Sequence, residues 1–492
     1  MATLDHDALR AFVETVWNEE VTPTLVDYIR IPNKSPMFEP DWEKLGHMEK
    51  AVQMFAGWAR EKIKALPRTT LEILRAPGRT PLIVIDSPGK VSGETVLLYG
   101  HLDKQPEMTG WTAGKGPWIP VLEGDKLYGR GGADDGYALF GALTALLALE
   151  KEGVARARSV IIIEASEESG SPDLPHYMDQ LARKIGDVGL VICLDSGCGD
   201  YDRLWLTTSL RGLVGGTLKI DVLEEGVHSG DASGIVPSSF RILRMLLDRI
   251  DDVSTGGVTP AAFHAPIPDD RLAQAKIAAE ALGIGVYKKF PFVGDMRPAS
   301  DDHVELILNR TWRAALSVTG FDGAPPPSGA GNVLRPHTAV KISLRLPPTT
   351  DADRASAELK RILESDPPYG AKVSFTPEQP GSGWNAPPTA DWLQDAFDRA
   401  SKAAWGAKAA MMGEGGSIPF MGMLGKVFPK AQFAITGVLG PNSNAHGPNE
   451  FLHLPTGKRV TETVAHILDA HAREYGAAPK GGGGLFGLFR SR

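Results

Sequence analysis

Apolar residues recur along the chain with two different periods. Over residues 5–30 and 41–66 they recur at helical spacing, and the segment RIPNKSP separates the two predicted helices. Further on, the β-branched runs PLIVIDSP, ETVLLYGHLD, SVIIIEAS and GLVICLD predict strands, with a glycine-rich turn and a predicted helix at 137–152 between the second and third. Strands that alternate with helices predict an α/β fold with a mostly parallel sheet and helices on both of its faces.

The pattern changes after the segment LTTSLRG. Two alternating strands, LVGGTLKIDVL and TAVKISLRL, are each followed by a predicted helix, and AKVSFTPE ends the series. We therefore expect an inserted α+β (ferredoxin-like) lid domain at residues 210–383. The catalytic domain would be discontinuous, with residues 1–209 and 384–478, and residues 479–492 would form a flexible Gly-rich tail. A chain of 492 residues is too long for a single hydrophobic core, which agrees with this division.

Composition and charge narrow the class of protein. The net charge of −8 argues against partners that favour basic surfaces, so we expect no nucleic acid and no anionic membrane as a partner. The N-terminal residues lack a basic region followed by an apolar run, and the longest apolar helix candidate, YALFGALTALLALE, is too short to span a bilayer. Two cysteines cannot provide a disulfide scaffold. A cytoplasmic location is therefore predicted.

Acidic residues and histidines gather where the predicted strands end. Each lies at a strand end or in a loop beside one: His101, Asp103, Asp134, Asp135, Glu167, Glu168, Asp195 and His446. In α/β sheets ligands bind outside the carboxyl ends of the strands. Two imidazoles and three carboxylates suit a pair of divalent ions that share one bridging carboxylate. Taken singly, each motif also fits a turn, a helix cap or a solvated loop, but potential ligands at four successive strand ends favour a metal centre.

In order and context, the motifs GHLDKQP, LYGRGGADDG, EASEESGS, VICLD and NAHGPNE resemble the M20 family of di-metal peptidases and amidohydrolases. The resemblance is nearest to the carnosinase-like (cytosolic non-specific dipeptidase-like) branch and covers nearly the whole chain except the tail. It implies two divalent metal ions per subunit, zinc in the first place, with manganese or cobalt as alternatives. Asp134 would bridge the two ions. One ion would also bind His101 and Asp195, and the other Glu168 and His446.

The resemblance also implies which residues handle protons. Glu167 would be the general base that activates a water bridging the two metals. Asp103 would hydrogen-bond the second ring nitrogen of His101 and so fix its tautomer. Because successive side chains of an extended backbone point to opposite sides, we expect Glu168 to hold a cation while Glu167 faces the water.

Substrate-binding positions are implied in the inserted domain and after it. His228, in GVHSGDASG, would polarise the scissile carbonyl by reaching across a homodimer formed through the lid domain. The remaining positions match substrate contacts of the family: Asn332, Arg345, Glu414, Gly416 and Ser417. Arg345 is suited to a bidentate grip on a free carboxylate. A solvated strand face for Arg345 and a simple turn at HSGDASG are the structural alternatives.

One position departs from the family's pattern. Many relatives carry a lysine two residues after the bridging aspartate, where this chain has Gly136. The expected function is that of a hydrolase that cleaves a peptide or amide bond next to a free carboxylate, most readily in dipeptides. The alternatives are an N-acyl-amino-acid deacylase of the same family and, in a different class, a catalytically inactive ligand-binding or assembly protein.

Overall fold

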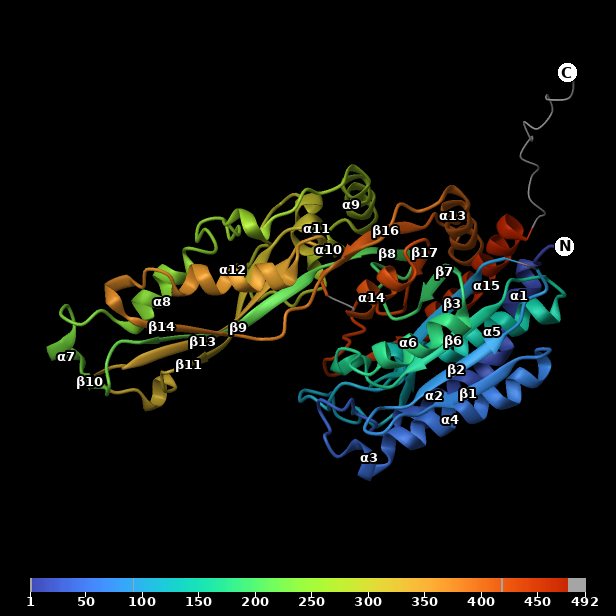
Figure 1. The fold of residues 1–492 in the computed structure, drawn as a ribbon, viewed down its shortest axis with the longest axis horizontal. Coiled ribbons are helices and arrows are strands. Elements are labelled where there is room, and N and C mark those ends of the chain that lie inside the picture. The colour runs from blue at the N-terminus through green and yellow to red at the C-terminus, as the bar shows by residue number, and fades with distance from the viewer. Residues whose placement is uncertain (1, 92, 417–418, 477–492) are drawn as a thin grey trace, which may run out of the picture. The chain divides into compact units, whose positions relative to one another are not determined.

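The computed structural model describes residues 2–91, 93–416 and 419–476 (Figure 1). The chain divides into two compact units. The second unit consists of Thr207–Ala386 and Met411–Met423, and the first contains the described residues before, between and after these segments. We expected residues 411–423 in the catalytic domain, whereas Met411–Met423 group with the second unit. Within this segment, strand β16 (Ala410–Glu414) lies beside β8 (Trp205–Leu210) in a three-stranded sheet.

A six-stranded sheet forms the centre of the first unit, with the strand order β1-β2-β6-β3-β7-β17. The strands are β1 Thr70–Leu74, β2 Leu82–Ser87, β3 Thr95–His101, β6 Ser159–Glu164, β7 Val188–Cys193 and β17 Gln432–Ile435. Strand β3 pairs in parallel with β6 and β7, and β17 pairs in parallel with β7. Only β1 and β2 add antiparallel pairs at one edge, so the sheet is mostly parallel, as predicted.

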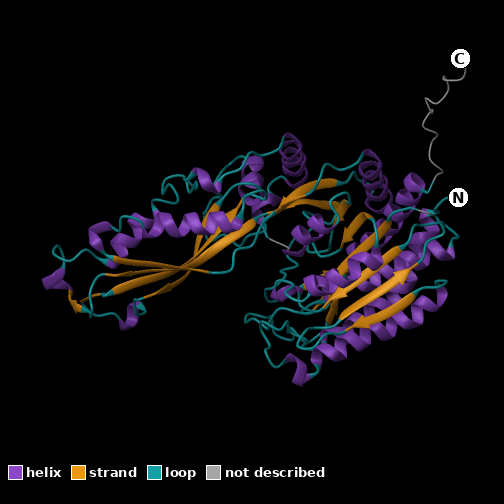
Figure 2. Cartoon of the chain, in the orientation of Figure 1, coloured by secondary structure: helices purple, strands orange, loops and turns teal. Residues whose placement is uncertain are grey.

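Both faces of this sheet are covered, since every residue of β3, β6 and β7 is buried. Helix α5 (Ala138–Lys151) is buried from Ala138 to Leu149 and packs against β3, β6 and α15, which confirms the helix predicted at 137–152. The other α-helices with residues in this unit are α1 His6–Val16, α2 Thr22–Ile29, α3 Trp42–Leu45, α4 His47–Lys62, α6 Leu174–Ile185, α13 Asp391–Trp405, α14 Pro419–Val427 and α15 Leu454–Tyr475 (Figure 2).

A small sheet joins two parts of the chain that are distant in sequence. Its strands are β4 Val121–Glu123, β5 Lys126–Tyr128 and β18 Phe451–His453, in the order β18-β5-β4. Tyr128 pairs with Phe451. The turn that follows β5 and the loop that precedes β18 are therefore held side by side.

The second unit contains the predicted ferredoxin-like arrangement. Strand β9 (Gly212–Asp221), helix α8 (Ser239–Leu247), strands β11 (Ala315–Asp322) and β13 (His337–Leu346), helix α12 (Ala352–Glu364) and strand β14 (Lys372–Pro377) follow one another as β-α-β-β-α-β. The antiparallel sheet has the order β11-β13-β9-β14. Its core is formed by apolar residues of the sheet and both helices, among them Val214, Leu218, Ile242, Leu344 and Leu359.

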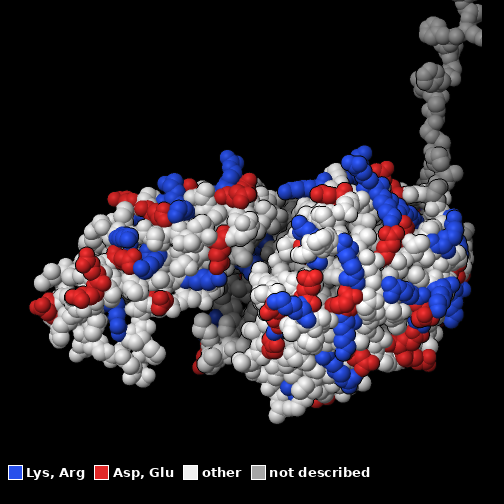
Figure 3. All heavy atoms as spheres, turned by 60° about the horizontal axis from the view of Figure 1, so that its bottom comes forward, with Lys and Arg blue, Asp and Glu red and all other residues white. Residues whose placement is uncertain are grey.

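The second unit also contains elements that the sequence did not predict. They are β8, β15 (Trp384–Asn385) and β16 in one sheet, the pair β10 (Val227–His228) and β12 (Val333–Leu334), and the helices α7 Ser229–Ala232, α9 Asp269–Leu282, α10 Gly285–Lys288 and α11 His303–Thr311. Within the described parts of the chain, no helix combines the length and the apolar character needed to cross a membrane. On the face drawn in Figure 3, basic and acidic side chains are interspersed.

Candidate metal centre

The carboxyl ends of three neighbouring parallel strands, β6, β3 and β7, meet at one edge of the central sheet. His101 is the last residue of β3 and pairs with Glu164 of β6. Tyr99 pairs with Cys193 at the end of β7, so Asp195 follows two residues later beside His101. This edge is where α/β proteins bind ligands, because the loops that leave the strands there converge.

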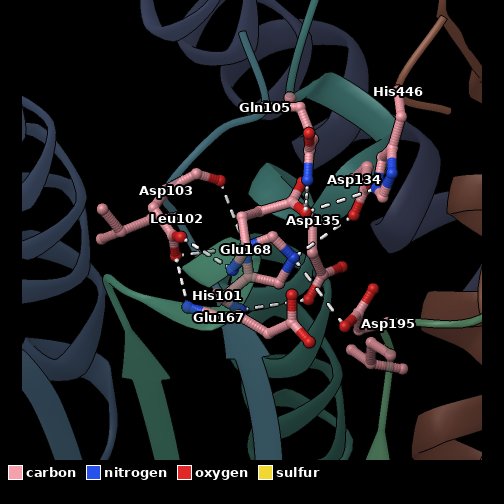
Figure 4. A network of polar contacts seen from close by, with 12 residues as sticks. His101, Leu102, Asp103, Gln105, Asp134, Asp135, Glu167, Glu168, Asp195 and His446 are labelled. Carbon is pink, nitrogen blue, oxygen red and sulfur yellow. Dashed lines mark hydrogen bonds and ion pairs between the residues drawn. The ribbon is translucent and has the colours of Figure 1, made fainter. Parts of the chain in front are cut away.

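The five residues predicted as metal ligands come together at this edge (Figure 4). His101 Nε2 lies 3.3 Å from Asp134 Oδ1 and 3.8 Å from Asp195 Oδ2. His446 Nε2 lies 3.0 Å from Asp134 Oδ2 and 3.3 Å from Glu168 Oε2. Within each of the two groups the ligand atoms lie within 4.8 Å of one another, and Asp134 belongs to both groups. Its carboxylate therefore lies between the two histidines, as a bridging ligand would.

The charges of this cluster fit divalent cations. Burial, followed by the charge of Asp195, raises the pKa of Glu167 well above its ordinary value, and burial followed by Asp134 does the same for Glu168. Burial opposes the charged form of His101, but Asp195 and other carboxylates nearby raise its pKa well above the usual range. Such a buried excess of negative charge is stabilised by a cation, and a mixed imidazole and carboxylate donor set suits zinc, manganese or cobalt.

Asp103 orients His101. Nδ1 of His101 lies 3.2 Å from the main-chain oxygen of Asp103 and 3.4 Å from its carboxylate Oδ1. Because two acceptors surround Nδ1, we assign the ring proton to that nitrogen, which leaves the lone pair of Nε2 directed at the ligand carboxylates. The main-chain oxygen of Asp103 is the nearer acceptor, and the role of Asp103 in fixing the tautomer of His101 stays a prediction.

Glu167 and Glu168 lie on a short 3₁₀ turn, Glu167–Ser169, so the expectation of an extended backbone there is wrong. The carboxylate of Asp103 organises this turn by accepting the main-chain N–H groups of Glu167 at 3.1 Å and Glu168 at 3.0 Å. Gln105 Nε2 then donates to Glu168 Oε2 at 2.6 Å. Figure 4 shows the Glu167 carboxylate on the side of Asp195, away from Gln105. The side chains of the two glutamates therefore have different neighbours, although the residues are adjacent in the turn.

A buried ion pair that the sequence analysis overlooked joins two of the motifs. The Arg130 guanidinium contacts the Glu450 carboxylate, and their side chains are 1% and 0% exposed. Arg130 also donates to the main-chain oxygen of His446 at 3.1 Å, and the N–H of Gly131 donates to Glu450 at 2.8 Å. The pair thus fastens the turn that carries Asp134 to the loop that carries His446. The only feature of the sequence that could have indicated this ion pair is the presence of an arginine in the motif LYGRGGADDG and a glutamate in the motif NAHGPNE.

Replacing Glu450 with Gln is expected to lower the free energy of unfolding by about 3–5 kcal/mol, because the charge of Arg130 would remain buried without its partner. Urea unfolding of the metal-free protein, followed by tryptophan fluorescence, measures this loss. The double variant Arg130→Met, Glu450→Met removes both charges and is expected to lose clearly less. If the double variant unfolds as easily as Glu450→Gln, the buried charge is not the cause.

Tyr28 explains the departure at Gly136. A Cβ atom at Gly136 would lie 2.4 Å from Cε1 of the Tyr28 ring and 2.6 Å from the main-chain oxygen of Gly131, so a lysine cannot fit there. A buried lysine nevertheless lies against the same ring, although burial lowers its pKa well below the usual value. Lys104 Nζ lies 3.8 Å from the Tyr28 ring centroid and donates to the main-chain oxygens of Tyr28 and Ile31, both at 2.8 Å.

The substrate-binding positions predicted in the second unit form two groups. His228 lies on β10 and Asn332 directly precedes β12, and the N–H of Ser229 donates to the main-chain oxygen of Asn332 at 3.0 Å. Nδ1 of His228 accepts the N–H of Gly230 at 3.1 Å, so its ring proton lies on Nε2. The other group consists of positions on β13, at the end of β16 and just after it: Arg345, Glu414 and Gly416. Ser417 lies outside the described residues.

These two groups do not meet within one chain. Arg345 pairs with Leu213 near the start of β9, whereas His228 follows Asp221 at the other end of that strand. Asp221 lies eight positions after Leu213 on this strand, which corresponds to about 26 Å at roughly 3.3 Å per residue. In Figure 1, β10 lies beyond the end of β9 that is remote from β8 and β16.

The sequence profile of Peptidase family M20/M25/M40 matches residues 97–470. The chain belongs to this family. This M20 protein is 26% identical to the Cysteinylglycine-S-conjugate dipeptidase of Corynebacterium striatum over 461 residues, which cover 90% of this chain and 97% of that protein. It is also 26% identical to the Beta-Ala-His dipeptidase of Homo sapiens over 388 residues, 75% of this chain and 73% of that protein.

The fold agrees with this assignment. Human carnosine dipeptidase 1 superimposes with a TM-score of 0.74 over 96% of this chain and 99% of that chain, at 21% sequence identity. The family and branch expected from the five motifs are thereby confirmed, and with them the expectation of a hydrolase. The M20 assignment and the two groups of ligand atoms together support a metallopeptidase with a site for two metal ions.

Proposed function

We propose that this M20 hydrolase is a metal-dependent dipeptidase that cleaves the peptide bond next to a free carboxylate. The observation that carries this proposal is the convergence of four other ligand side chains around Asp134, with Glu167 beside them. The two relatives reported above are named as dipeptidases, which favours dipeptides as the substrates of this chain. The intact ligand set and Glu167 argue against an inactive binding protein.

We propose two divalent ions per subunit, zinc in the first place and manganese or cobalt as alternatives. Asp134 would bridge them, with His101 and Asp195 on one ion and Glu168 and His446 on the other. When bound, such ions lower the pKa of a water molecule and polarise the scissile carbonyl. The protein's part is to hold the five ligands at fixed positions, and Asp103 does this for His101 and for the turn that carries Glu168.

Glu167 is the proposed general base. Its main-chain N–H is fixed by Asp103, and among the residues that the structure describes no side chain or main-chain group hydrogen-bonds its carboxylate. Glu168, in contrast, is engaged by Gln105 and His446. The free carboxylate of Glu167 can take a proton from the attacking water and later deliver it to the leaving amine.

The residues proposed to bind the substrate are His228, Asn332, Arg345, Glu414, Gly416 and Ser417. The ring proton on Nε2 lets His228 donate a hydrogen bond to the scissile carbonyl oxygen. Arg345 would bind the terminal carboxylate. Because about 26 Å of strand separates Arg345 from the His228 end of the sheet, a dipeptide cannot touch both side chains of one chain. This separation supports the proposal that a second copy supplies His228.

We propose that the second unit forms this homodimer through β11. This strand lies at an edge of its sheet, with Val318 48% and Phe321 53% exposed. An exposed apolar edge strand is a template for pairing with another chain. Sedimentation equilibrium at micromolar concentration is expected to show a dimer, and the double variant Val318→Lys, Phe321→Lys is expected to be monomeric. A monomeric unmodified protein would contradict the proposal.

A cytoplasmic location stays a prediction.

A substrate panel tests the dipeptidase proposal. The purified protein is treated with a chelator, supplied with zinc, manganese or cobalt, and assayed on Cys-Gly and β-Ala-His against N-acetyl amino acids. We expect metal-dependent hydrolysis with kcat/KM on a dipeptide at least about 10-fold above that on any N-acetyl amino acid. The reverse order would identify a deacylase. Absence of metal-dependent turnover on every substrate would identify a binding protein.

A further inference from the structure

Two arginines of the second unit, Arg211 and Arg310, lie against the segment Glu414–Gly416, and a third, Arg345, shares a sheet face with Arg211. Arg211, only 8% exposed, donates from Nε to the main-chain oxygen of Gly415 at 3.3 Å. Its Nη1 donates to the main-chain oxygen of Asn309 at 3.1 Å, near the end of α11. Arg211 therefore ties this loop to α11 and uses its donors on main-chain oxygens.

Arg310 borders the same loop from α11. A Cβ atom at Gly415 would lie 3.3 Å from both Nη2 of Arg211 and Cγ of Arg310, so the two arginines approach this glycine together. Among the described residues, the one hydrogen bond of the Arg310 guanidinium goes to Sδ of Met412 at 3.1 Å. A thioether is a weak acceptor, which leaves most of the donors of Arg310 available.

Arg345 approaches from the sheet. It lies opposite Leu213, and residues two apart on an extended chain face the same side, so Arg345 and Arg211 share one face of the sheet. That face is opposite to the core, since the neighbouring pair Leu344 and Val214 is buried beneath the helices. Burial, then the charges of Arg345 and Arg310, lower the pKa of Arg211 to about 10, in agreement with this grouping.

The positive charge of the cluster is not balanced. Among the described residues, neither Arg310 nor Arg345 has a carboxylate oxygen within 4.0 Å, and Glu414 is the one acidic residue of the loop. The next arginine, Arg313, differs because its guanidinium is paired with Glu305 at 2.5 Å. Three guanidinium groups with one carboxylate among them leave room for two negative charges of a ligand.

We propose that Arg310 and Arg345 together bind two carboxylates of the substrate, so that the enzyme prefers dipeptides with a C-terminal Asp or Glu. This inference rests on the proposed dipeptidase function. One guanidinium binds the terminal carboxylate and the other binds the acidic side chain, while Arg211 holds the loop between them. A neutral side chain of the same shape would leave Arg310 without its partner.

The test compares Ala-Glu with Ala-Gln and Ala-Asp with Ala-Asn, which differ in charge and hardly in shape. Because the contact is charge-assisted, we expect kcat/KM to be at least about 10-fold higher for the acidic member of each pair, through a lower KM. In Arg310→Gln this preference is expected to fall to within about twofold, and Arg310→Lys is expected to restore part of it. Arg354→Gln, on the exposed side of α12, is the matched control and should keep the full preference.

Equal rates on Ala-Glu and Ala-Gln in the unmodified protein would overturn the inference, and so would an equal loss on both in Arg310→Gln. If no dipeptide is hydrolysed at all, the proposed function fails first, and calorimetric titration then decides about the site. Glutarate is expected to bind at least about 10-fold more tightly than butyrate, with the difference lost in Arg310→Gln. Equal binding of the two acids would overturn the inference independently of turnover.

Discussion

Replacing Glu167 with Gln is expected to lower kcat by at least about 100-fold while the protein keeps its metal ions, and Glu167→Ala is expected to behave in the same way. The reason is that Glu167 lies beside the ligands but outside both ligand groups, with a carboxylate free to carry a proton. An amide of the same shape cannot accept the proton of the attacking water. Steady-state hydrolysis of a dipeptide, with elemental analysis of the same sample, measures both parts of this prediction.

The matched control is Glu72→Gln, because Glu72 lies on the edge strand β1 and pairs with Lys184 at the surface. It should leave kcat and metal content unchanged. The role assigned to Glu167 would be refuted by a variant that retains nearly full kcat. Loss of metal from Glu167→Gln would instead place this residue among the ligands.

The second large effect is expected at Asp134. Its two carboxylate oxygens face His101 and His446 separately, so it is the residue that both ligand groups share. The side chain of Asp134→Asn offers one oxygen and no negative charge. We expect this variant to lose both ions, with affinity lowered by more than about 100-fold, because removing a ligand costs more than the 10- to 100-fold of an outer hydrogen-bond partner.

Variants of the unshared ligands provide the comparison. Asp195→Asn and His446→Asn each remove a ligand of one group only, so each is expected to keep about one ion per chain after dialysis. Asp41→Asn, at an exposed position, is the control and should keep two. Elemental analysis of the dialysed proteins distinguishes the three expected metal contents, which are no ion, one ion and two ions per chain. Retention of two ions by Asp134→Asn would show that Asp134 does not bridge them.

The amino-acid sequence was enough to predict which segments form the central sheet and which residues stand at its edge. Continuous β-branched runs such as VIIIE and LVIC are typical of strands in a sheet whose two faces are both covered by helices. The residues that follow such a strand lie at its carboxyl end. His101, Glu168 and Asp195 could therefore be assigned to one edge before any coordinates were known. The role of His446 as a ligand was expected from the resemblance, because its loop lies well beyond the end of β17, the strand of the central sheet that precedes it.

The contacts that support these residues could not be predicted from the sequence and follow from the folded arrangement of the chain. The pairing of β5 with β18 brings Arg130 against Glu450, and neither residue carries a local signal of its partner some 300 positions away. The turn at Glu167 depends on the carboxylate of Asp103, and the absence of a side chain at Gly136 depends on the ring of Tyr28. Local periodicity reports burial, whereas ion pairs, turns and close contacts depend on which segments become neighbours in space.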